Sequence, residues 1–502
     1  MTSATHPHKW QALALVCLAY FMTTLDVSIV TVALPSITRS LHFSPTDLQW
    51  VLTAYAVTFG GLLLLGGRAG DLFGRRLMLM SGLAIFVAAS LACGLANGSA
   101  MLITARALQG VGAALISPAT LAIITTTFDE GAERNRALGV WGAMGGAGAA
   151  AGVLFGGLLT KYAGWEWIFF VNVPIGALLF MAAPFRVAES RAPLESRQRD
   201  LPGGVMVTAG IALLVFTISR APTVGWGSGE TIGLLVGAVV LLIAFVLWET
   251  RVSAPLVPLS VFKIRSVSSA NVVAILLGAS VFANFFLLTL YAQDVLGFSA
   301  LRTGVTFFAT AGTMVLVAGF AQAATTRFGA RPVLTAGMAF LTGGMIWYAQ
   351  IPVRGHFVNN LLGGYLLVGV GLALPFVSVS ILALQGVGPK IAGLASGLLT
   401  SSQQVGGAIG VAVTGSVAVS RANSLLAAGH TAPYALTHGY ALAFWVLAGI
   451  AFAGVLLAAL TAPRGAGELV SSGPVPDPGQ LVNSVTLQVA SVAEHGSVFD
   501  RN

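Results

Sequence analysis

The sequence predicts an all-α polytopic membrane protein with 14 transmembrane helices. Of its 502 residues, 56% are hydrophobic and only 8% are charged, whereas soluble globular domains carry about 25% charged residues. Apolar runs of about 20 residues recur along the chain, and each is long enough to cross the hydrocarbon core of a bilayer. The 61 glycines fit helices that pack closely in lipid, where small residues allow backbones to approach.

Windowed hydropathy places the spans in order along the chain. They are 10–34, 47–66, 77–97, 100–127, 136–160, 165–185, 202–220, 230–248, 267–293, 303–325, 332–351, 359–386, 392–420 and 438–462. The first is not a cleavable signal peptide, because it runs for about 25 residues, contains Asp26, and has no small-residue cleavage site before the next span.

Two charged connections divide the spans into groups of six, two and six. One connection follows the sixth span and the other follows the eighth. Residues 73–76 also resemble residues 328–331, at the start of the second group of six, which indicates a parallel repeat with a substrate site between its halves. We therefore predict an N-terminal six-helix bundle (1–200), two linker transmembrane helices (201–262), a C-terminal six-helix bundle (263–462) and a flexible cytoplasmic tail (463–502).

The basic residues predict the orientation in the membrane. With the N-terminus in the cytoplasm, eighteen lysines and arginines fall inside and six fall outside, as the positive-inside rule requires. Both termini are then cytoplasmic. The excess of arginine over lysine, with many Ala, Gly and Val residues, indicates a GC-rich bacterial genome and hence the bacterial cytoplasmic (inner) membrane.

Asp26 and Arg106 are the candidate proton-coupling residues. Asp26 lies about 16 residues into the first span, where an acid is costly and usually functional. Arg106 lies at a similar depth in the fourth span, so we expect it within electrostatic reach of Asp26. The alternatives are a permanently hydrogen-bonded carboxyl group and an arginine that snorkels to the interface. Thr23 and Gln109, on the same helix faces, are candidates for a substrate cavity.

Residues 66–76 form a charged, glycine-rich hinge between the second and third spans. We interpret it as a gating loop, made of Gly67, Arg68, Gly70, Asp71, Gly74, Arg75 and Arg76. In one interpretation it is a solvated turn. In the other, Asp71 docks at the positive dipole end of the helix that begins near Lys390, and latches the cytoplasmic side.

A stripe of glycines in the fifth span predicts close helix contact. Its members in the predicted set are Gly142, Gly145, Gly152 and Gly156. The stripe is either tight packing alone or a sliding surface between the bundles. Four aromatic residues are further candidates for the substrate cavity, although aromatics in spans more often face lipid or pack: Phe282, Phe285, Phe286 and Phe376.

Several chemistries are not expected. The sequence has no Gly-Lys pair and so no Walker A loop for ATP. Its seven histidines lack metal-ligand spacing, and the net charge of +8 reports topology rather than nucleic-acid binding. We expect no enzyme, no metal and no cofactor, with a proton gradient as the energy source. Glu166, Asp294 and Glu249, at helix ends, are expected to be ordinary hydrated residues.

The chain resembles the fourteen-helix drug:proton antiporter branch of the major facilitator superfamily. The resemblance extends to about residue 462 and rests on 25–35, the loop 66–76, 106–112, the glycine series and 165–176. The chain has Val153 where the fifth-helix motif usually has proline.

The resemblance implies efflux of small amphipathic drugs, antibiotics or secondary metabolites by alternating access and proton antiport. It assigns coupling to Asp26 and Arg106, and gating to Asp71, Arg75 and Arg76. Because the second group of six lacks deep acids, neutral, weakly charged or monocationic substrates are favoured. We expect a monomer. The alternatives are an importer or exchanger of a native metabolite and, in another class, a nontransporting receptor or assembly subunit.

Overall fold

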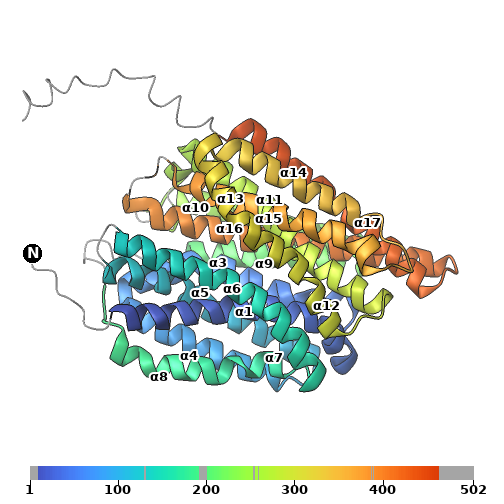
Figure 1. The fold of residues 1–502 in the computed structure, drawn as a ribbon, viewed down its shortest axis with the longest axis horizontal. Coiled ribbons are helices and arrows are strands. Elements are labelled where there is room, and N and C mark those ends of the chain that lie inside the picture. The colour runs from blue at the N-terminus through green and yellow to red at the C-terminus, as the bar shows by residue number, and fades with distance from the viewer. Residues whose placement is uncertain are drawn as a thin grey trace, which may run out of the picture. The chain divides into compact units, whose positions relative to one another are not determined.

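The computed structural model describes residues 9–128, 132–191, 200–252, 255–257, 259–385, 387 and 389–462. The described part of the chain is helical and contains no strand (Figure 1). The predicted tail, 463–502, lies outside the described residues, and the predicted bundle boundaries stay predictions.

The helices follow the predicted spans in order, and the sixth and tenth spans are each divided between two helices. In the first part of the chain they are α1 (Lys9–Leu41), α2 (Pro45–Leu48), α3 (Trp50–Phe73), α4 (Arg75–Gly94), α5 (Ser99–Thr127), α6 (Ala132–Tyr162), α7 (Trp167–Phe170) and α8 (Asn172–Arg186). Next come α9 (Leu201–Val224), α10 (Gly229–Glu249) and the short η2 (Leu259–Lys263). The rest are α11 (Arg265–Leu290), η3 (Tyr291–Val295), α12 (Ala300–Thr306), α13 (Phe308–Phe328), α14 (Ala330–Tyr348), η4 (Phe357–Leu361), α15 (Leu362–Leu384), α16 (Pro389–Ala427) and α17 (Ala432–Thr461).

Twelve helical segments of the described chain are long and apolar enough to cross a membrane. α6 and α14, of 31 and 19 residues, coincide with the two remaining predicted spans. The fourteen-helix prediction is therefore confirmed. The end of the helices that carries residues 66–76 is called the motif end below, and the opposite end is called the far end.

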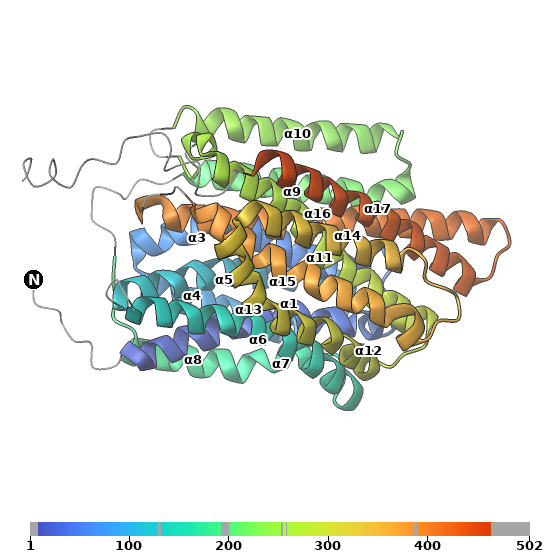
Figure 2. The same cartoon turned by 45° about the horizontal axis from the view of Figure 1, so that its top comes forward.

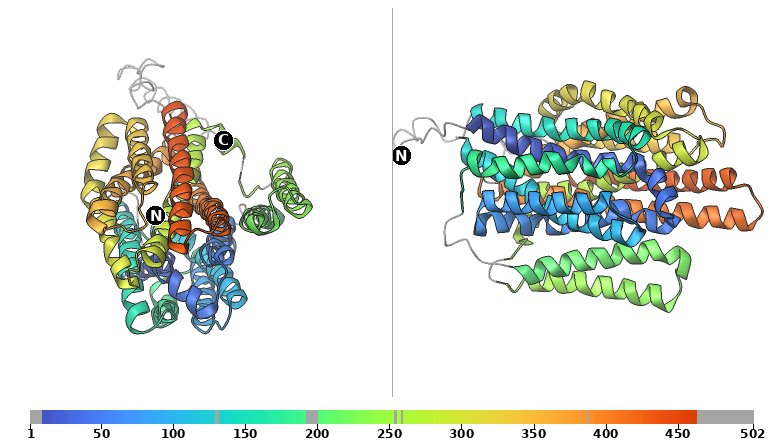
Figure 3. Two further views of the ribbon diagram at one scale, coloured as in Figure 1. Left: turned by 90° about the vertical axis from the view of Figure 1, so that its right-hand side faces the viewer. Right: turned by 90° about the horizontal axis from the view of Figure 1, so that it is seen from below.

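Figures 2 and 3 show how the linker helices lie. α9 contacts α3 and α16. α10 packs mainly on α9 and lies outside α9, α3 and α16. Most of the apolar side chains of α10 are exposed, as in a helix that meets lipid on most of its surface.

Glycines of α6 pack this helix directly against α1, the helix that carries Asp26. A Cβ atom built on Gly152 would overlap Ser28 Oγ and lie 2.5 Å from the Leu25 carbonyl oxygen. One built on Gly156 would lie 2.7 Å from the Ile29 carbonyl oxygen, and one on Gly145 would lie 2.8 Å from a Tyr20 ring carbon. The surroundings of Gly142 lie outside what the structure describes. The stripe is thus a close contact with α1.

A different face of α6 touches the second half of the chain. A Cβ atom on Gly157 would lie 2.8 Å from Leu301 Cα, and one on Gly304 would lie 2.6 Å from the Val153 carbonyl oxygen. Gln293 Nε2 also donates to the Val32 carbonyl oxygen over 2.7 Å. These backbone-level contacts join the two halves at the far end.

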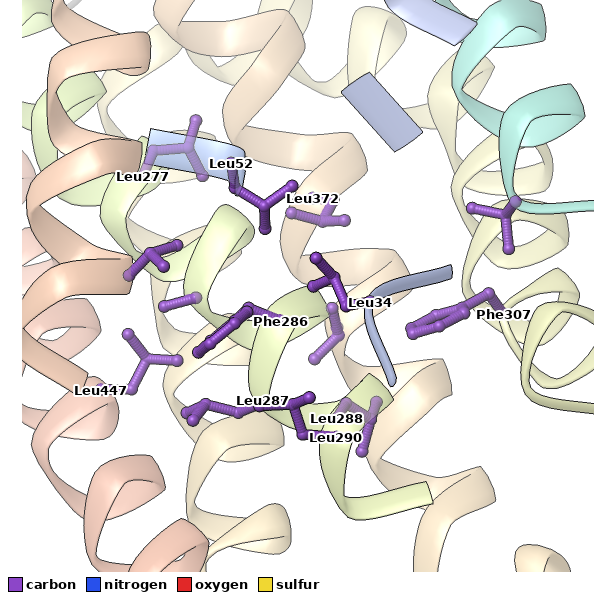
Figure 4. Close-up of a cluster of buried hydrophobic side chains, with 14 of the residues drawn as sticks. Leu34, Leu52, Leu277, Phe286, Leu287, Leu288, Leu290, Phe307, Leu372 and Leu447 are labelled. Carbon is purple, nitrogen blue, oxygen red and sulfur yellow. The ribbon is translucent and has the colours of Figure 1, made fainter. Parts of the chain in front are cut away.

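A hydrophobic cluster spans both halves (Figure 4). Leu34 of α1 and Leu52 of α3 belong to it, together with Leu277 and Phe286 of α11 and Leu447 of α17, and all five are buried. This core fixes α1 relative to α11, and so places the helix that carries Asp26 at the boundary between the two halves.

Candidate functional site

Asp26 is fully buried and forms an ion pair with Arg106. Asp26 lies on α1 with 0% of its surface exposed, and Arg106 lies on α5 with 1% exposed. Arg106 Nη1 is 2.6 Å from Asp26 Oδ2. The predicted contact is therefore present, and Arg106 does not snorkel to the interface.

Two amides bind the other oxygen of Asp26. Gln109 Nε2 donates to Asp26 Oδ1 over 2.7 Å, and Asn172 Nδ2, from the start of α8, donates to the same oxygen over 2.9 Å. An ionised carboxylate is acceptor-only. Three donors therefore satisfy Asp26 in its charged form, and this geometry is that of the ionised state.

Arg106 is held independently of Asp26. Its Nε donates to the Val51 carbonyl oxygen of α3 over 2.8 Å, and its Nη1 donates to Gln109 Oε1 over 2.6 Å. Its guanidinium carbon lies 4.4 Å from the centroid of the Tyr55 ring, within the range of a cation–π contact. Loss of the Asp26 charge would therefore leave Arg106 in place with other partners.

Gln109 links the ion pair to α4. Its Nε2 also donates to Ser90 Oγ over 2.8 Å. Gln109 and Ser90 are both fully buried. Side chains or backbone of α1, α3, α4, α5 and α8 thus converge on one carboxylate. A change in the charge of Asp26 would alter a hydrogen-bond network that involves all five helices. The change is costly, because a buried charge that loses its partner is destabilising.

The sequence did not reveal Asn172, Ser90 or Tyr55 as members of this site. Asn172 stands inside the resemblance motif 165–176 but had no role assigned there. A buried amide in an apolar span is the one signal that would have singled it out. Thr23 is buried and donates to the Tyr20 carbonyl oxygen over 2.8 Å, so its hydroxyl bonds within α1.

The gating loop is braced by a residue that sequence reasoning missed. Gly74 has φ +119, a backbone conformation that favours glycine. The Glu189 carboxylate accepts from the backbone N–H groups of Arg76 and Leu77, each over 3.2 Å. Glu189 therefore caps the first turn of α4, where negative charge is favourable.

The other gating-loop residues lie on two helices. Gly67, Arg68 and Gly70 lie in the last turns of α3, and Arg75 and Arg76 begin α4. The side chains of Asp71 and Lys390 lie outside what the structure describes, so the latch stays a prediction.

The four candidate aromatics lie in the second half of the chain. Phe286 is buried in the hydrophobic cluster. The ring centroids of Phe285 and Phe307 are 5.0 Å apart and tilted by 50°, Phe282 lies against Gly407, and Phe376 is half-buried. Within the described residues, no hydrogen bond or ring contact joins these four to the Asp26 site. Their place in a substrate cavity stays a prediction.

The described residues contain no group of three or more His, Cys, Asp or Glu side chains that could hold a metal ion. Both cysteines, Cys17 and Cys93, are buried and unpaired with one another. The chemistry of the site is thus that of charge and hydrogen bonding around a single carboxylate.

The chain is similar over most of its length to several known export and resistance proteins. The chain is 40% identical to the cephamycin export protein CmcT of Amycolatopsis lactamdurans over 405 residues, which cover 80% of this chain and 83% of the relative. It is 39% identical to the puromycin resistance protein pur8 of Streptomyces alboniger, with 90% of each chain covered. It is 34% identical to the tetracenomycin C resistance and export protein of Streptomyces glaucescens, with 84% and 78% covered.

Solved structures show the same fold. The crystal structure of the POT family transporter PepTSo has a TM-score of 0.68 at 16% identity, and the match covers 90% of this chain and 97% of that one. A bacterial homologue of the human lysosomal transporter Spinster, in an inward-facing conformation, has a TM-score of 0.63, with 91% and 97% covered. Residues 16–411 match the sequence profile of the Major Facilitator Superfamily. The chain belongs to the Major Facilitator Superfamily and is a multi-pass membrane transporter, not an enzyme.

Proposed function

We propose that this protein is a proton-coupled efflux antiporter. It exports small amphipathic antibiotics or secondary metabolites across the bacterial cytoplasmic membrane, with both termini in the cytoplasm. The names of the relatives support export, since they refer to export of, or resistance to, cephamycin, puromycin and tetracenomycin C. ATP and metal ions have no part in the proposed cycle, and a monomer is sufficient for it.

The buried Asp26–Arg106 ion pair is the observation that carries the proposal. A carboxylate with 0% exposure can exchange a proton with water only after the surrounding helices move. Binding of a proton would neutralise Asp26 and remove the ion pair, while Val51 and Gln109 keep Arg106 in place. Protonation is thereby linked to the packing of α1 against α5 and α8, which is the requirement for alternating access.

The second half of the chain supports the substrate class. From residue 265 to 462, Asp294 is the single acid in the sequence, so this half offers no deep carboxylate to a dication. One inward proton supplies about 2.3 kcal/mol per 100 mV of membrane potential and about 1.4 kcal/mol per pH unit. A neutral solute can use both terms, whereas a monocation exchanged one-for-one can use only the pH term.

The gating loop completes the proposed cycle. Asp71 would dock at the start of α16 when the cytoplasmic side closes, and Glu189 would keep the first turn of α4 rigid behind it. This latch is the part of the cycle that acts at the cytoplasmic mouth, whereas the proton is exchanged at Asp26.

Transport in inverted vesicles tests the proposal. With an acidic lumen, we expect a fluorescent cationic dye and puromycin to accumulate in vesicles that contain the protein, and to be released when a protonophore collapses the gradient. Asp26→Asn should insert normally but lose uphill accumulation. The matched control is Glu230→Gln, an exposed acid in the first turn of α10, which should transport normally.

Two results would count against the proposal. Accumulation that continues after the gradient is collapsed would exclude proton antiport. Normal uphill transport by Asp26→Asn would remove Asp26 from coupling and leave only the transporter fold.

A further inference from the structure

A second buried acidic site lies in the linker helices, away from Asp26. Asp200 immediately precedes α9, and Glu249 is the last residue of α10. Each is only 3% exposed. The prediction that Glu249 is an ordinary hydrated residue is therefore wrong, because the start of α9 and the connection after α10 cover it.

Asp200 is bound as an ionised carboxylate. Its Oδ1 accepts from the Gly203 N–H over 2.9 Å, which caps α9, and from the Trp248 indole N–H over 2.7 Å. Burial alone would raise the pKa of Asp200, but interaction with the Glu249 carboxyl group and the hydrogen bonds from Gly203 and Trp248 outweigh burial and hold this pKa below its usual range. The charge of the pair therefore resides on Asp200.

Glu249 has one oxygen satisfied and one free. Its Oε2 accepts from the Val257 N–H over 3.0 Å. Its Oε1 has no donor, and neither has Asp200 Oδ2. Both unpartnered oxygens point to the same place, since a Cβ atom built on Gly203 would overlap Asp200 Oδ2 and lie 2.8 Å from Glu249 Oε1. Oxygens of the two carboxyl groups therefore share the space beside Gly203.

Two facing carboxylates, each with an unpartnered buried oxygen, are unstable without a positive charge between them. Among the described residues the surroundings contain none, and Arg197 and Arg199, which precede Asp200 in the sequence, lie outside the described residues. Three basic residues lie nearby in the sequence: Arg251 after α10, Lys263 at the end of η2 and Arg265 at the start of α11. All three are exposed and form no described ion pair with Asp200 or Glu249. The side chains packed nearby are apolar, including Leu65 of α3, Leu256 and Val257. A proton held between the two oxygens would remove the repulsion between the carboxylates.

We propose that Asp200 and Glu249 form a proton-binding site, in which Glu249 Oε1 carries one proton and donates it to Asp200 Oδ2. The bound proton fastens three segments together: the start of α9, the end of α10, and the connection through Val257 that leads to α11. Loss of the proton would place two carboxylates against each other in an apolar setting and loosen this attachment. This site is independent of the coupling role of Asp26.

The proposal gives a definite sign for the pH dependence. Stability contributed by a proton held in the folded protein is complete at acidic pH, and is lost as the pH rises past the value at which the pair releases it. Glu249→Gln replaces the proton-carrying oxygen by an amide donor of the same shape. This variant should therefore keep the stability of the protonated pair at every pH.

Infrared spectroscopy and thermal unfolding of the full-length protein in lipid nanodiscs test the site. In the wild type we expect a carbonyl band of a protonated carboxyl group that disappears at alkaline pH, together with a fall in Tm of at least about 3 °C. In Glu249→Gln that band should be absent, and Tm should stay constant over the same pH range. Asp200→Asn should also lose the band, because its amide group donates to Glu249 and no proton is shared. This variant tests the site if Glu249→Gln fails to fold.

Two controls keep the assignment specific. Glu230→Gln, at the other end of α10, should retain the band and the wild-type pH profile, because Glu230 is exposed. Asp26→Asn should also retain both, which separates this site from the coupling site.

Three outcomes would overturn the proposal. One is a titrating band that persists in Glu249→Gln and Asp200→Asn. The second is an identical pH dependence of Tm in Glu249→Gln and the wild type. The third is stabilisation of the wild type, but not of Glu249→Gln, by Na⁺, K⁺ or Mg²⁺ at constant pH and ionic strength, since a metal ion would then occupy the place assigned to the proton.

Discussion

At the scale of the residue, Asp26 and Arg106 show how a charged pair is kept in an apolar span. Neither charge is left alone: Asp26 accepts from Arg106, Gln109 and Asn172, and Arg106 also donates to the Val51 carbonyl oxygen. Such buried pairs contribute little net stability, but removal of one partner strongly destabilises the folded protein. The pair therefore favours one arrangement of the helices as long as Asp26 is ionised.

A double-mutant cycle measures this coupling. We expect Arg106→Gln to lower the free energy of unfolding by about 3–5 kcal/mol, because it leaves the buried Asp26 charge without its cation. Asp26→Asn with Arg106→Gln should be less destabilised than the sum of the single variants, by about 1–3 kcal/mol. Denaturant titration of the purified protein in detergent provides the measurement.

The exposed pair of Arg220 and Glu230 is the matched control for that cycle. Its atoms are 2.7 Å apart, but the side chains are 51% and 47% exposed. A cycle on this pair should give less than about 1 kcal/mol. Equal coupling in the two cycles would contradict the view that burial makes the Asp26 pair sensitive.

At the scale of the element, α6 is shaped for two different neighbours. Gly152 and Gly156 let the backbone of α6 touch α1, whereas Gly157 meets α12 on another face. The contact with α1 positions the helix that carries Asp26. Any side chain added there must push the two helices apart, since backbone oxygens of α1 lie only 2.5 Å from a Cβ on Gly152 and 2.7 Å from a Cβ on Gly156.

Gly152→Ala tests the α1 contact. We expect a lower melting temperature and weaker uphill transport, because the added methyl group would lie 2.5 Å from the Leu25 carbonyl oxygen and overpacking of this kind costs about 1–3 kcal/mol. Gly233→Ala in α10, with nothing within 4 Å of the new Cβ, should be neutral or slightly stabilising. A Gly152→Ala protein as stable and active as Gly233→Ala would show that the helices can separate without cost.

At the scale of the whole molecule, the two halves meet at the far end through backbone atoms. Gly157 lies against Ala300 and Leu301, and Gly304 lies against the Val153 carbonyl group. Gln293 adds a hydrogen bond to Val32. The far end is thus closed in this structure, and its opening requires α6 and α12 to part.

Gly157→Val should shift the protein toward a state that is open at the far end. The larger side chain cannot fit against Leu301, so the closed arrangement is penalised while the open one is not. Spin labels at Lys161 and Arg302, both exposed, should report a longer distance in this variant by electron paramagnetic resonance. Gly312→Val in α13, where a Cβ has open space, should leave the distances unchanged, and a Gly157→Val distance equal to this control would refute the expectation.

The sequence by itself determined the number and order of the spanning helices, because the length of an apolar run is set by the thickness of the bilayer. It also predicted that Asp26 and Arg106 lie at a similar depth and within electrostatic reach, since the depth of each residue along its own helix can be counted at 1.5 Å per residue. Only the tertiary structure decided which helix faces which. Asn172 and Ser90 join the Asp26 site, and Glu249 is buried against Asp200, because helices far apart in sequence turn particular faces toward one another, and that rotation depends on packing among all of them.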